Sequence, residues 1–125
     1  GKPPKHPPGS VQFGGHWYKA LLTEKGTWAQ AHEACKQTGG HLVCVESETE
    51  KHFVSELAGK EGDLWIGALS NAQGQRFWVN GAPASGKSFG ANYKPAEAAR
   101  AVVGRRGWND RGMTELNGFI CEWDR

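Results

Sequence analysis

The chain has 125 residues, the length of one typical domain of roughly 100–150 residues. Its 15 Lys and Arg residues nearly balance 13 Asp and Glu residues, so the formal net charge is +2. This balance argues against a dedicated nucleic-acid binder, which concentrates basic residues on one face. No apolar stretch reaches the roughly 18 residues of a membrane-spanning helix, and the start lacks the pattern of a signal peptide, so neither is expected.

The first ten residues differ in composition from the rest of the chain. Four of the six prolines lie at positions 3, 4, 7 and 8, and a Gly-Ser pair follows them. This composition is typical of an extended linker. We therefore expect residues 1–10 to be a proline-rich linker or leader and residues 11–125 to be the folded domain, within a larger protein.

Two helices are predicted, each by a capping signal followed by an apolar face. Thr27 and Gln30 have the spacing of a capping box, and apolar residues then recur at helical spacing as far as Cys35, before two glycines. Ser47 and Glu50 repeat the capping-box spacing, and a glycine at position 59 ends the second helix. The apolar face of the second helix contains Phe53, Val54, Leu57 and Ala58.

Short strands are predicted in the remaining apolar segments. They are expected within residues 11–22, 41–45, 64–69, 76–79 and 118–123. The stretch from 80 to 107 is instead rich in Gly, Ala, Ser and Lys, interrupted by the apolar run 101–103. Such long loops in compact domains usually serve a function, so this stretch is the expected recognition region.

Residues 81–88 match the P-loop pattern letter for letter. A true P-loop leads directly into a helix whose N-terminus binds phosphate, whereas a glycine and then Pro95 follow here. The chain also lacks the βαβ alternation of a parallel nucleotide-binding sheet. Nucleotide binding through residues Gly81 to Ser88 is therefore the least favoured hypothesis.

The histidines and Cys44 are predicted to be structural. The five histidines do not share metal-ligand spacing, so scaffold or surface roles are expected for them. Cys44 lies in the predicted strand at 41–45, where His41, three residues away, would lie on the opposite face. We therefore expect Cys44 to be an inert buried thiol, and we expect no enzymatic activity.

Five motifs in a fixed order resemble those of the C-type lectin-like domain family. They are the first-helix Cys35, Gly-Gly-His-Leu at 39–42, Trp-Ile-Gly-Ala at 65–68, Trp-Asn-Asp at 108–110 and Phe-Ile-Cys-Glu at 119–122. The resemblance covers residues 11–125. It implies an α+β double-loop domain whose terminal strands pair, with two helices flanking short antiparallel sheets and a projecting long loop. It also implies a Cys35–Cys121 disulfide, hence an extracellular or cell-surface location.

The sequence departs from the family pattern in its long loop. Ala99 and Met113 occupy the positions of the family's second disulfide, so apolar packing is expected there instead. Residues 90–92 read Gly-Ala-Asn in place of the calcium-binding tripeptide, which removes one ligand and the proline. The residues that still match the family's calcium ligands are Asn92, Glu97, Asn109 and Asp110. Since calcium requires several oxygen ligands, they predict at most a weak calcium site.

The predicted function is non-catalytic recognition of a glycan or protein ligand by the long-loop region, without tight calcium binding. The expected ligand-binding residues are Asn92, Tyr93, Glu97, Arg105, Asn109 and Asp110. Arginine and aromatic side chains commonly anchor interfaces. Two alternatives remain: the Asn and Asp of the Trp-Asn-Asp motif can simply satisfy a turn backbone, and the domain can be an architectural or assembly unit of an extracellular protein.

Overall fold

The computed structural model describes residues 7–59, 63–70, 75–84, 100–104, 107–111 and 115–124, with the backbone alone for 104 and 107–111. The strands are β1 (Val11–Phe13), β2 (His16–Gly26), β3 (His41–Leu42), β4 (Leu64–Ser70), β5 (Arg76–Trp78), β6 (Arg100–Gly104), β7 (Gly107–Arg111) and β8 (Asn117–Trp123). The helices are α1 (Trp28–Gln37) and α2 (Glu48–Ala58). No helix within these ranges combines the length and apolar character needed to cross a membrane.

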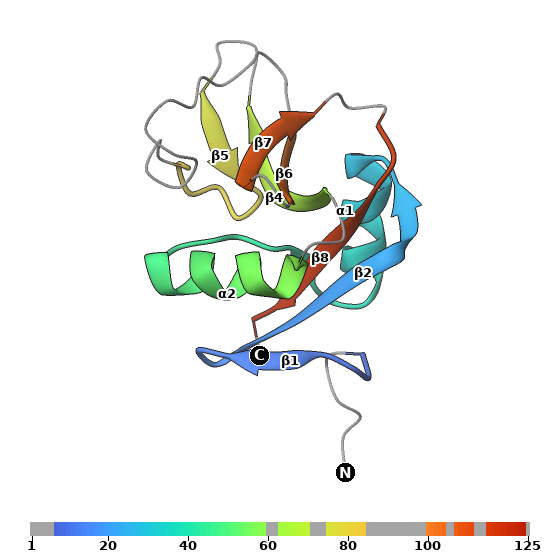
Figure 1. Ribbon diagram of the computed structural model, residues 1–125, viewed down its shortest axis with the longest axis vertical. Helices are drawn as coiled ribbons and strands as arrows, with labels where there is room; N and C mark the ends of the chain where they lie inside the picture. Colours follow the sequence, from blue (N-terminus) through green and yellow to red (C-terminus); the bar gives the residue numbers. More distant parts are fainter. Residues whose placement is uncertain are drawn as a thin grey trace.

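The sheet is built around β8, the last strand. β2 and β3 pair antiparallel with β8, whereas β4 runs parallel to it. The strand order is β1-β2-β8-β4-β6-β7, with β3 added to β8 and β5 added to β4. Strands from the two ends of the chain therefore lie side by side, as β2 and β8 do in Figure 1. The predicted α+β class and the pairing of terminal strands are both confirmed.

The first predicted strand region contains two strands. Val11 of β1 pairs with Tyr18 of β2 across a turn in which Gly14 and Gly15 have φ values of 57° and 84°. These left-handed conformations favour glycine, which lacks a Cβ. The second strand extends to Gly26, four residues beyond the predicted end.

Helix α1 begins at the predicted capping box. The amide of Gln30 donates to Thr27 Oγ1 at 3.2 Å, and the amide of Thr27 donates to Gln30 Oε1 at 3.0 Å. The predicted apolar positions Trp28, Ala31 and Cys35 are buried. The helix ends at Gln37, before the glycine pair, because the following backbone at Gly39 has a φ of 84°.

Helix α2 has the predicted N-cap but not the predicted capping box. Ser47 Oγ accepts a hydrogen bond from the amide of Glu50 at 3.0 Å, as expected. The carboxylate of Glu50, however, accepts from the amide of Glu46 at 2.7 Å and from the hydroxyl of Tyr18 at 2.5 Å. Tertiary packing against β2 therefore redirects this side chain away from the local partner that the sequence pattern suggested.

The predicted strand at 41–45 is shorter than expected. Only His41 and Leu42 form β3, although residues 42–45 are all buried. Beyond Leu42, Val43 still donates its amide to Ile120 and accepts from Gly67, at 3.0 and 2.8 Å. The apolar run therefore predicted burial correctly, but its backbone bonds are divided between separate strands instead of forming one regular ladder.

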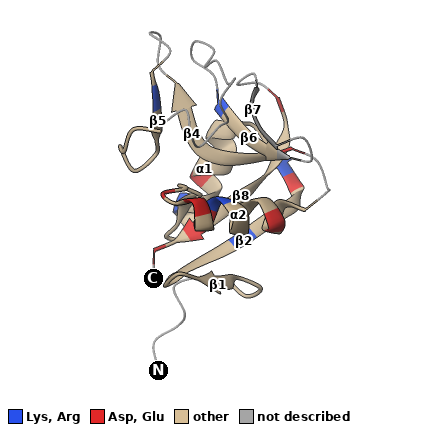
Figure 2. Ribbon diagram, turned by 60° about the vertical axis from the view of Figure 1, so that its left-hand side comes forward, with Lys and Arg blue, Asp and Glu red and all other residues tan. Residues whose placement is uncertain are grey.

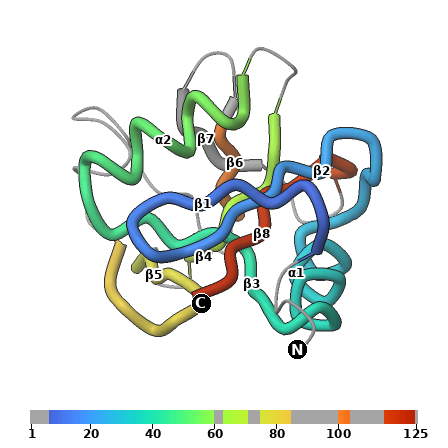
Figure 3. Tube along the Cα trace, turned by 90° about the horizontal axis from the view of Figure 1, so that it is seen from below, coloured from blue at the N-terminus to red at the C-terminus, as the bar shows by residue number. Residues whose placement is uncertain are grey.

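Two hydrophobic clusters lie on either side of the central strands, one beneath each helix. Val54 and Ala58 of α2 belong to one cluster, and Trp28, Ala31 and Cys35 of α1 belong to the other. Figure 3 shows α1 and α2 on opposite sides of β2 and β8. The Cys35–Cys121 disulfide joins α1 to β8, with Cα atoms 5.6 Å apart, and Cys44 is a buried free thiol.

Candidate functional site

The long-loop region contains a regular β-ribbon that the sequence did not predict in full. The apolar run 101–103 forms the centre of β6, where Ala101, Val102 and Val103 are at most 1% exposed. β6 pairs with β4 on one side and with β7 on the other. The buried β4–β6 pair therefore supports β7, the strand that contains the Trp-Asn-Asp motif.

The structure places two of the predicted ligand residues in β7. The Cα of Asn109 is opposite that of Val102, and the Cα of Asp110 is opposite that of Ala101. The motif thus lies in an antiparallel strand, and what its polar side chains contact is outside the described residues. The ligand or metal roles of these two residues stay predictions.

The other predicted long-loop residues lie outside the described residues. Asn92, Tyr93 and Glu97 fall in the range 85–99, and Arg105 falls in the pair 105–106. Ala99 and Met113, expected to replace the second disulfide, also fall outside the description. The calcium site and the ligand surface therefore remain predictions at these positions.

Arg100, at the start of β6, is held by contacts that the sequence did not indicate. Its guanidinium lies over the ring of Trp28, 4.8 Å from the ring centroid. The indole Nε1 of Trp28 in turn donates to the carbonyl of Ile66 at 2.8 Å. A cation–π contact of this kind stabilises by about 0.5–2 kcal/mol and links α1 to the strand that follows the long loop.

The described half of the P-loop-like segment forms a tight turn after β5. The amide of Ala82 donates to the Asn80 side chain at 2.9 Å, and the amide of Ala84 donates to the Arg76 carbonyl at 3.0 Å. Pro83 pairs with Phe77 as an isolated bridge. A phosphate-binding loop needs free amides that point at the ligand, and these two amides are already used.

A second group of polar residues gathers where β2, β3 and β8 meet, and no sequence spacing connects its members. His16 Nδ1 lies 2.5 Å from Glu122 Oε2 and 3.5 Å from Asp124 Oδ1. His41 Nε2 lies 3.0 Å from the same Asp124 oxygen. Contact with Glu122 raises the pKa of His16 above its usual value, whereas burial raises the pKa of Glu122.

The expected separation of His41 and Cys44 is wrong. Since β3 ends at Leu42, the strand alternation does not continue to Cys44, and its Sγ lies 3.8 Å from His41 Nδ1. That nitrogen also lies 2.7 Å from the Leu42 carbonyl, which can only accept a hydrogen bond. Burial alone lowers the pKa of His41, but contacts with Cys44, Asp124 and Leu42 outweigh it and raise the pKa to about 10. Cys44 is 2% exposed, so a substrate has little access to its thiol.

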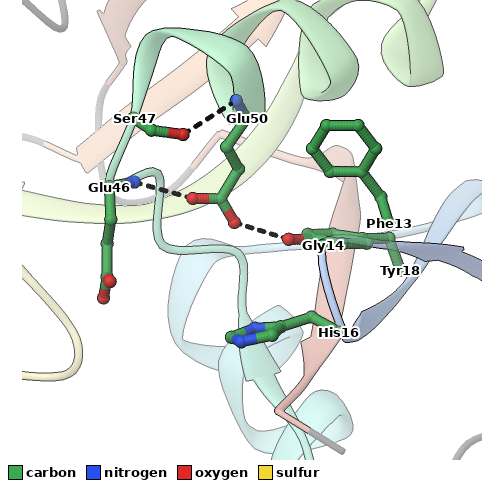
Figure 4. A pocket seen from close by; sticks show the side chains of 7 residues that line it. All are labelled: Phe13, Gly14, His16, Tyr18, Glu46, Ser47 and Glu50. Atoms are coloured by element: carbon green, nitrogen blue, oxygen red, sulfur yellow. Dashed lines mark hydrogen bonds between the residues drawn. The ribbon is translucent and has the colours of Figure 1, made fainter.

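A pocket of about 340 Å³ adjoins this group on the side of α2. Figure 4 shows Glu50 in the pocket wall, with its carboxylate joined to the Tyr18 hydroxyl and the Glu46 amide, and His16 on the opposite wall. Burial and then the hydrogen bond to Glu50 raise the pKa of Tyr18, so its hydroxyl remains a donor. The Tyr18–Glu50 pair links β2 to α2 and supports the pocket wall.

Residues 24–123 match the family model described as the lectin C-type domain. CD209 antigen-like protein A of Mus musculus is 28% identical over 118 residues, which are 90% of this chain and 49% of that protein. Snaclec bitiscetin subunit alpha of Bitis arietans is 29% identical over 120 residues, 88% of each chain. The chain thus spans about half of the first relative and most of the second.

Solved structures show the same fold. The carbohydrate-recognition domain of mouse scavenger receptor C-type lectin superposes with a TM-score of 0.78 at 25% identity, covering 96% of this chain and 98% of that one. SPL-1, solved in complex with GlcNAc, has a TM-score of 0.82 at 25% identity, with 94% and 93% of the chains covered. The two-helix, mixed-sheet architecture is therefore shared with these domains.

Proposed function

Because the chain belongs to the C-type lectin domain family, we propose that it is a non-catalytic recognition module that binds a glycan or a protein ligand. The observation that carries this proposal is the family match over residues 24–123. The β6–β7 ribbon supports it, because a buried strand pair holds the backbone of Asn109 and Asp110 beside the long loop. Asn92, Tyr93, Glu97 and Arg105 complete the proposed ligand surface.

We propose that this recognition does not depend on tightly bound calcium. Calcium normally takes six to eight oxygen ligands, and affinity depends on how many of them are charged. The proposed set of Asn92, Glu97, Asn109 and Asp110 contains two carboxylates and two amides. Position 90 is a glycine, which has no side-chain oxygen to add. This donor set fits a weak site better than a tight one.

The proposed location is extracellular or at a cell surface, because a structural disulfide persists in an oxidising compartment. We also propose that residues 1–10 are a linker and that residues 11–125 are one domain of a larger protein. An assembly role is the second candidate, since some relatives, such as snaclec bitiscetin subunit alpha, are named as subunits. No nucleic-acid partner is proposed.

A glycan array and a calcium titration together test the proposal. The purified chain is expected to bind a defined set of glycans, or a specific protein in a pull-down, and to keep binding in EDTA. Asp110→Ala and Arg105→Ala are expected to weaken binding, whereas Gln12→Ala, exposed on β1 away from the ribbon, is the matched control. Equal binding by all three variants would refute the proposed surface. Loss of glycan or protein binding in EDTA would refute calcium independence.

A further inference from the structure

Strand register brings two histidines and two carboxylates together at the end of β8. Trp17 is opposite Trp123 in the β2–β8 pair, so the preceding His16 comes beside Asp124. His41 is opposite Glu122 in the β3–β8 pair. Since alternate residues of a strand share one face, Glu122 and Asp124 lie on the same side of β8. The four residues therefore converge although they come from three separate segments.

The spacing of their donor atoms suits a small metal ion. Tetrahedral zinc binds nitrogen and oxygen ligands at about 2.0–2.2 Å, which places neighbouring ligand atoms about 3.3–3.6 Å apart. Asp124 Oδ1 lies 3.5 Å from His16 Nδ1, within this range, whereas the 2.5 Å contact of His16 Nδ1 with Glu122 Oε2 is a hydrogen bond that would lengthen around an ion. One donor atom from each of His16, Glu122 and Asp124 lies within 4.8 Å of the others. Small side-chain rotations would place them around one ion.

Outer hydrogen bonds already orient two residues of this group. The amide of Cys44 donates to Glu122 Oε1 at 3.0 Å, which leaves Oε2 facing His16. His41 Nδ1 donates to the Leu42 carbonyl at 2.7 Å, so that Nε2 faces Asp124. Metal-binding histidines and carboxylates usually have such second hydrogen bonds, which fix their orientation. Backbone hydrogen bonds therefore orient Glu122 toward His16 and His41 toward Asp124.

Charge and access also favour a cation here. The carboxylates of Glu122 and Asp124 together neutralise one dication when both histidines are neutral. Glu122 has only 3% of its side chain exposed, whereas Asp124 has 66% exposed, so an ion could enter from the Asp124 side. Figure 2 shows acidic positions at this end of β8, next to the C-terminus.

We propose that His16, Glu122 and Asp124 form a binding site for one transition-metal dication of the zinc class, with His41 as an outer hydrogen-bond partner of Asp124. Imidazole nitrogens suit zinc, copper and nickel, whereas calcium prefers oxygen ligands alone. The site lies at the end of the molecule opposite β7, the strand that contains Asn109 and Asp110 (Figure 1). A bound ion would tie the ends of β2, β3 and β8 together.

Calorimetric titration of the chelator-treated full chain with zinc chloride tests this site. One equivalent of zinc is expected to bind and to raise the melting temperature, and calcium chloride is not expected to compete. His16→Ala and Asp124→Asn are expected to weaken zinc binding by more than about tenfold, since even outer partners of metal ligands contribute 10–100-fold. The matched controls are His52→Ala, exposed on α2, and His6→Ala, in the proline-rich segment; both are expected to bind like the wild type.

Two further measurements identify the ligands directly. Cobalt substituted for zinc is expected to give the visible absorption of a four-coordinate nitrogen–oxygen site, and Asp124→Asn is expected to change it. Zinc affinity is expected to increase with pH, because histidine binds metal only when deprotonated and contact with Glu122 raises the pKa of His16. Asp124 is exposed at the chain end, so its variant remains informative if His16→Ala does not fold.

The proposal would be overturned by either of two results. One is the absence of heat and of thermal stabilisation with zinc at about pH 8. The other is wild-type affinity in Asp124→Asn together with loss of binding in His6→Ala or His52→Ala, which would assign the zinc to a surface histidine. Asp124→Asn is expected to bind its glycan or protein ligand as the wild type does. Failure of the zinc proposal would therefore not count against the proposed recognition function.

Discussion

Loss of the Cys35–Cys121 disulfide is expected to remove a large part of the stability of this domain. The bridge joins α1 to β8 across a sequence separation of 86 residues. A crosslink of that span stabilises the folded state by about 4–5 kcal/mol, because it restricts the unfolded chain. Single domains unfold with a total free energy of about 5–15 kcal/mol. The reduced protein is therefore expected to lose between about a third and nearly all of its net stability.

Urea unfolding, followed by the fluorescence of the six tryptophans, measures this effect. With a denaturant dependence of about 1–3 kcal/mol per molar urea, reduction is expected to lower the unfolding midpoint by about 1.3–5 M. The double variant Cys35→Ala/Cys121→Ala is expected to be less stable still, because both cysteines are buried and their sulfur atoms contribute packing.

Adding the reductant to the double variant is the control, and it is expected to change nothing, since Cys44 forms no disulfide. A fall in the wild-type midpoint of less than about 0.5 M on full reduction would refute the reasoning, because the free-energy change would then be far below the loop-closure value. Full reduction is verified by thiol titration after unfolding.

Three further changes are expected to have measurable effects. In Gly40→Ala, the added Cβ would lie 2.7 Å from the Glu122 carbonyl oxygen, so urea unfolding is expected to show a loss of about 1–3 kcal/mol; an unchanged midpoint would contradict this close contact. Tyr18→Phe removes the donor to the buried carboxylate of Glu50 and is expected to cost about 1.5–3 kcal/mol in the same assay, whereas a loss under about 0.5 kcal/mol would mean that the pair contributes little. Burial, and then Lys36, lower the pKa of His32 below 6.5, so the unfolded chain takes up protons more readily and stability falls as the pH drops below 6.5. His32→Gln is expected to flatten this fall in unfolding midpoints measured down to about pH 5, and parallel curves for the two proteins would argue against it.

Local patterns in the sequence predicted most of the secondary structure. The capping box of Thr27 and Gln30 and the apolar spacing after it depend on residues within one or two helical turns, and α1 forms as these predict. The order of the five family motifs also identified the fold, because those motifs mark core positions and turns that the fold requires. The ends of β2 and β3 were less predictable, since partner strands determine where a ladder stops.

The long-loop site was predicted only as a set of residues. Asn109 and Asp110 were identified by motif, and the tertiary structure added that they lie in a strand supported by β6. The capping-box prediction for Glu50 was also wrong, because that pattern depends only on residues close along the chain. The hydroxyl of Tyr18, 32 residues away, binds that carboxylate instead.

By itself, the sequence determined the helices, the family and the residues expected in the long loop, because these follow from local spacing and from motif order. Only the tertiary structure decided what surrounds each histidine. His16 lies 106 positions from Glu122, and His41 lies 83 positions from Asp124. No spacing rule connects residues so far apart, whereas the register of β2 and β3 on β8 brings them within hydrogen-bonding distance.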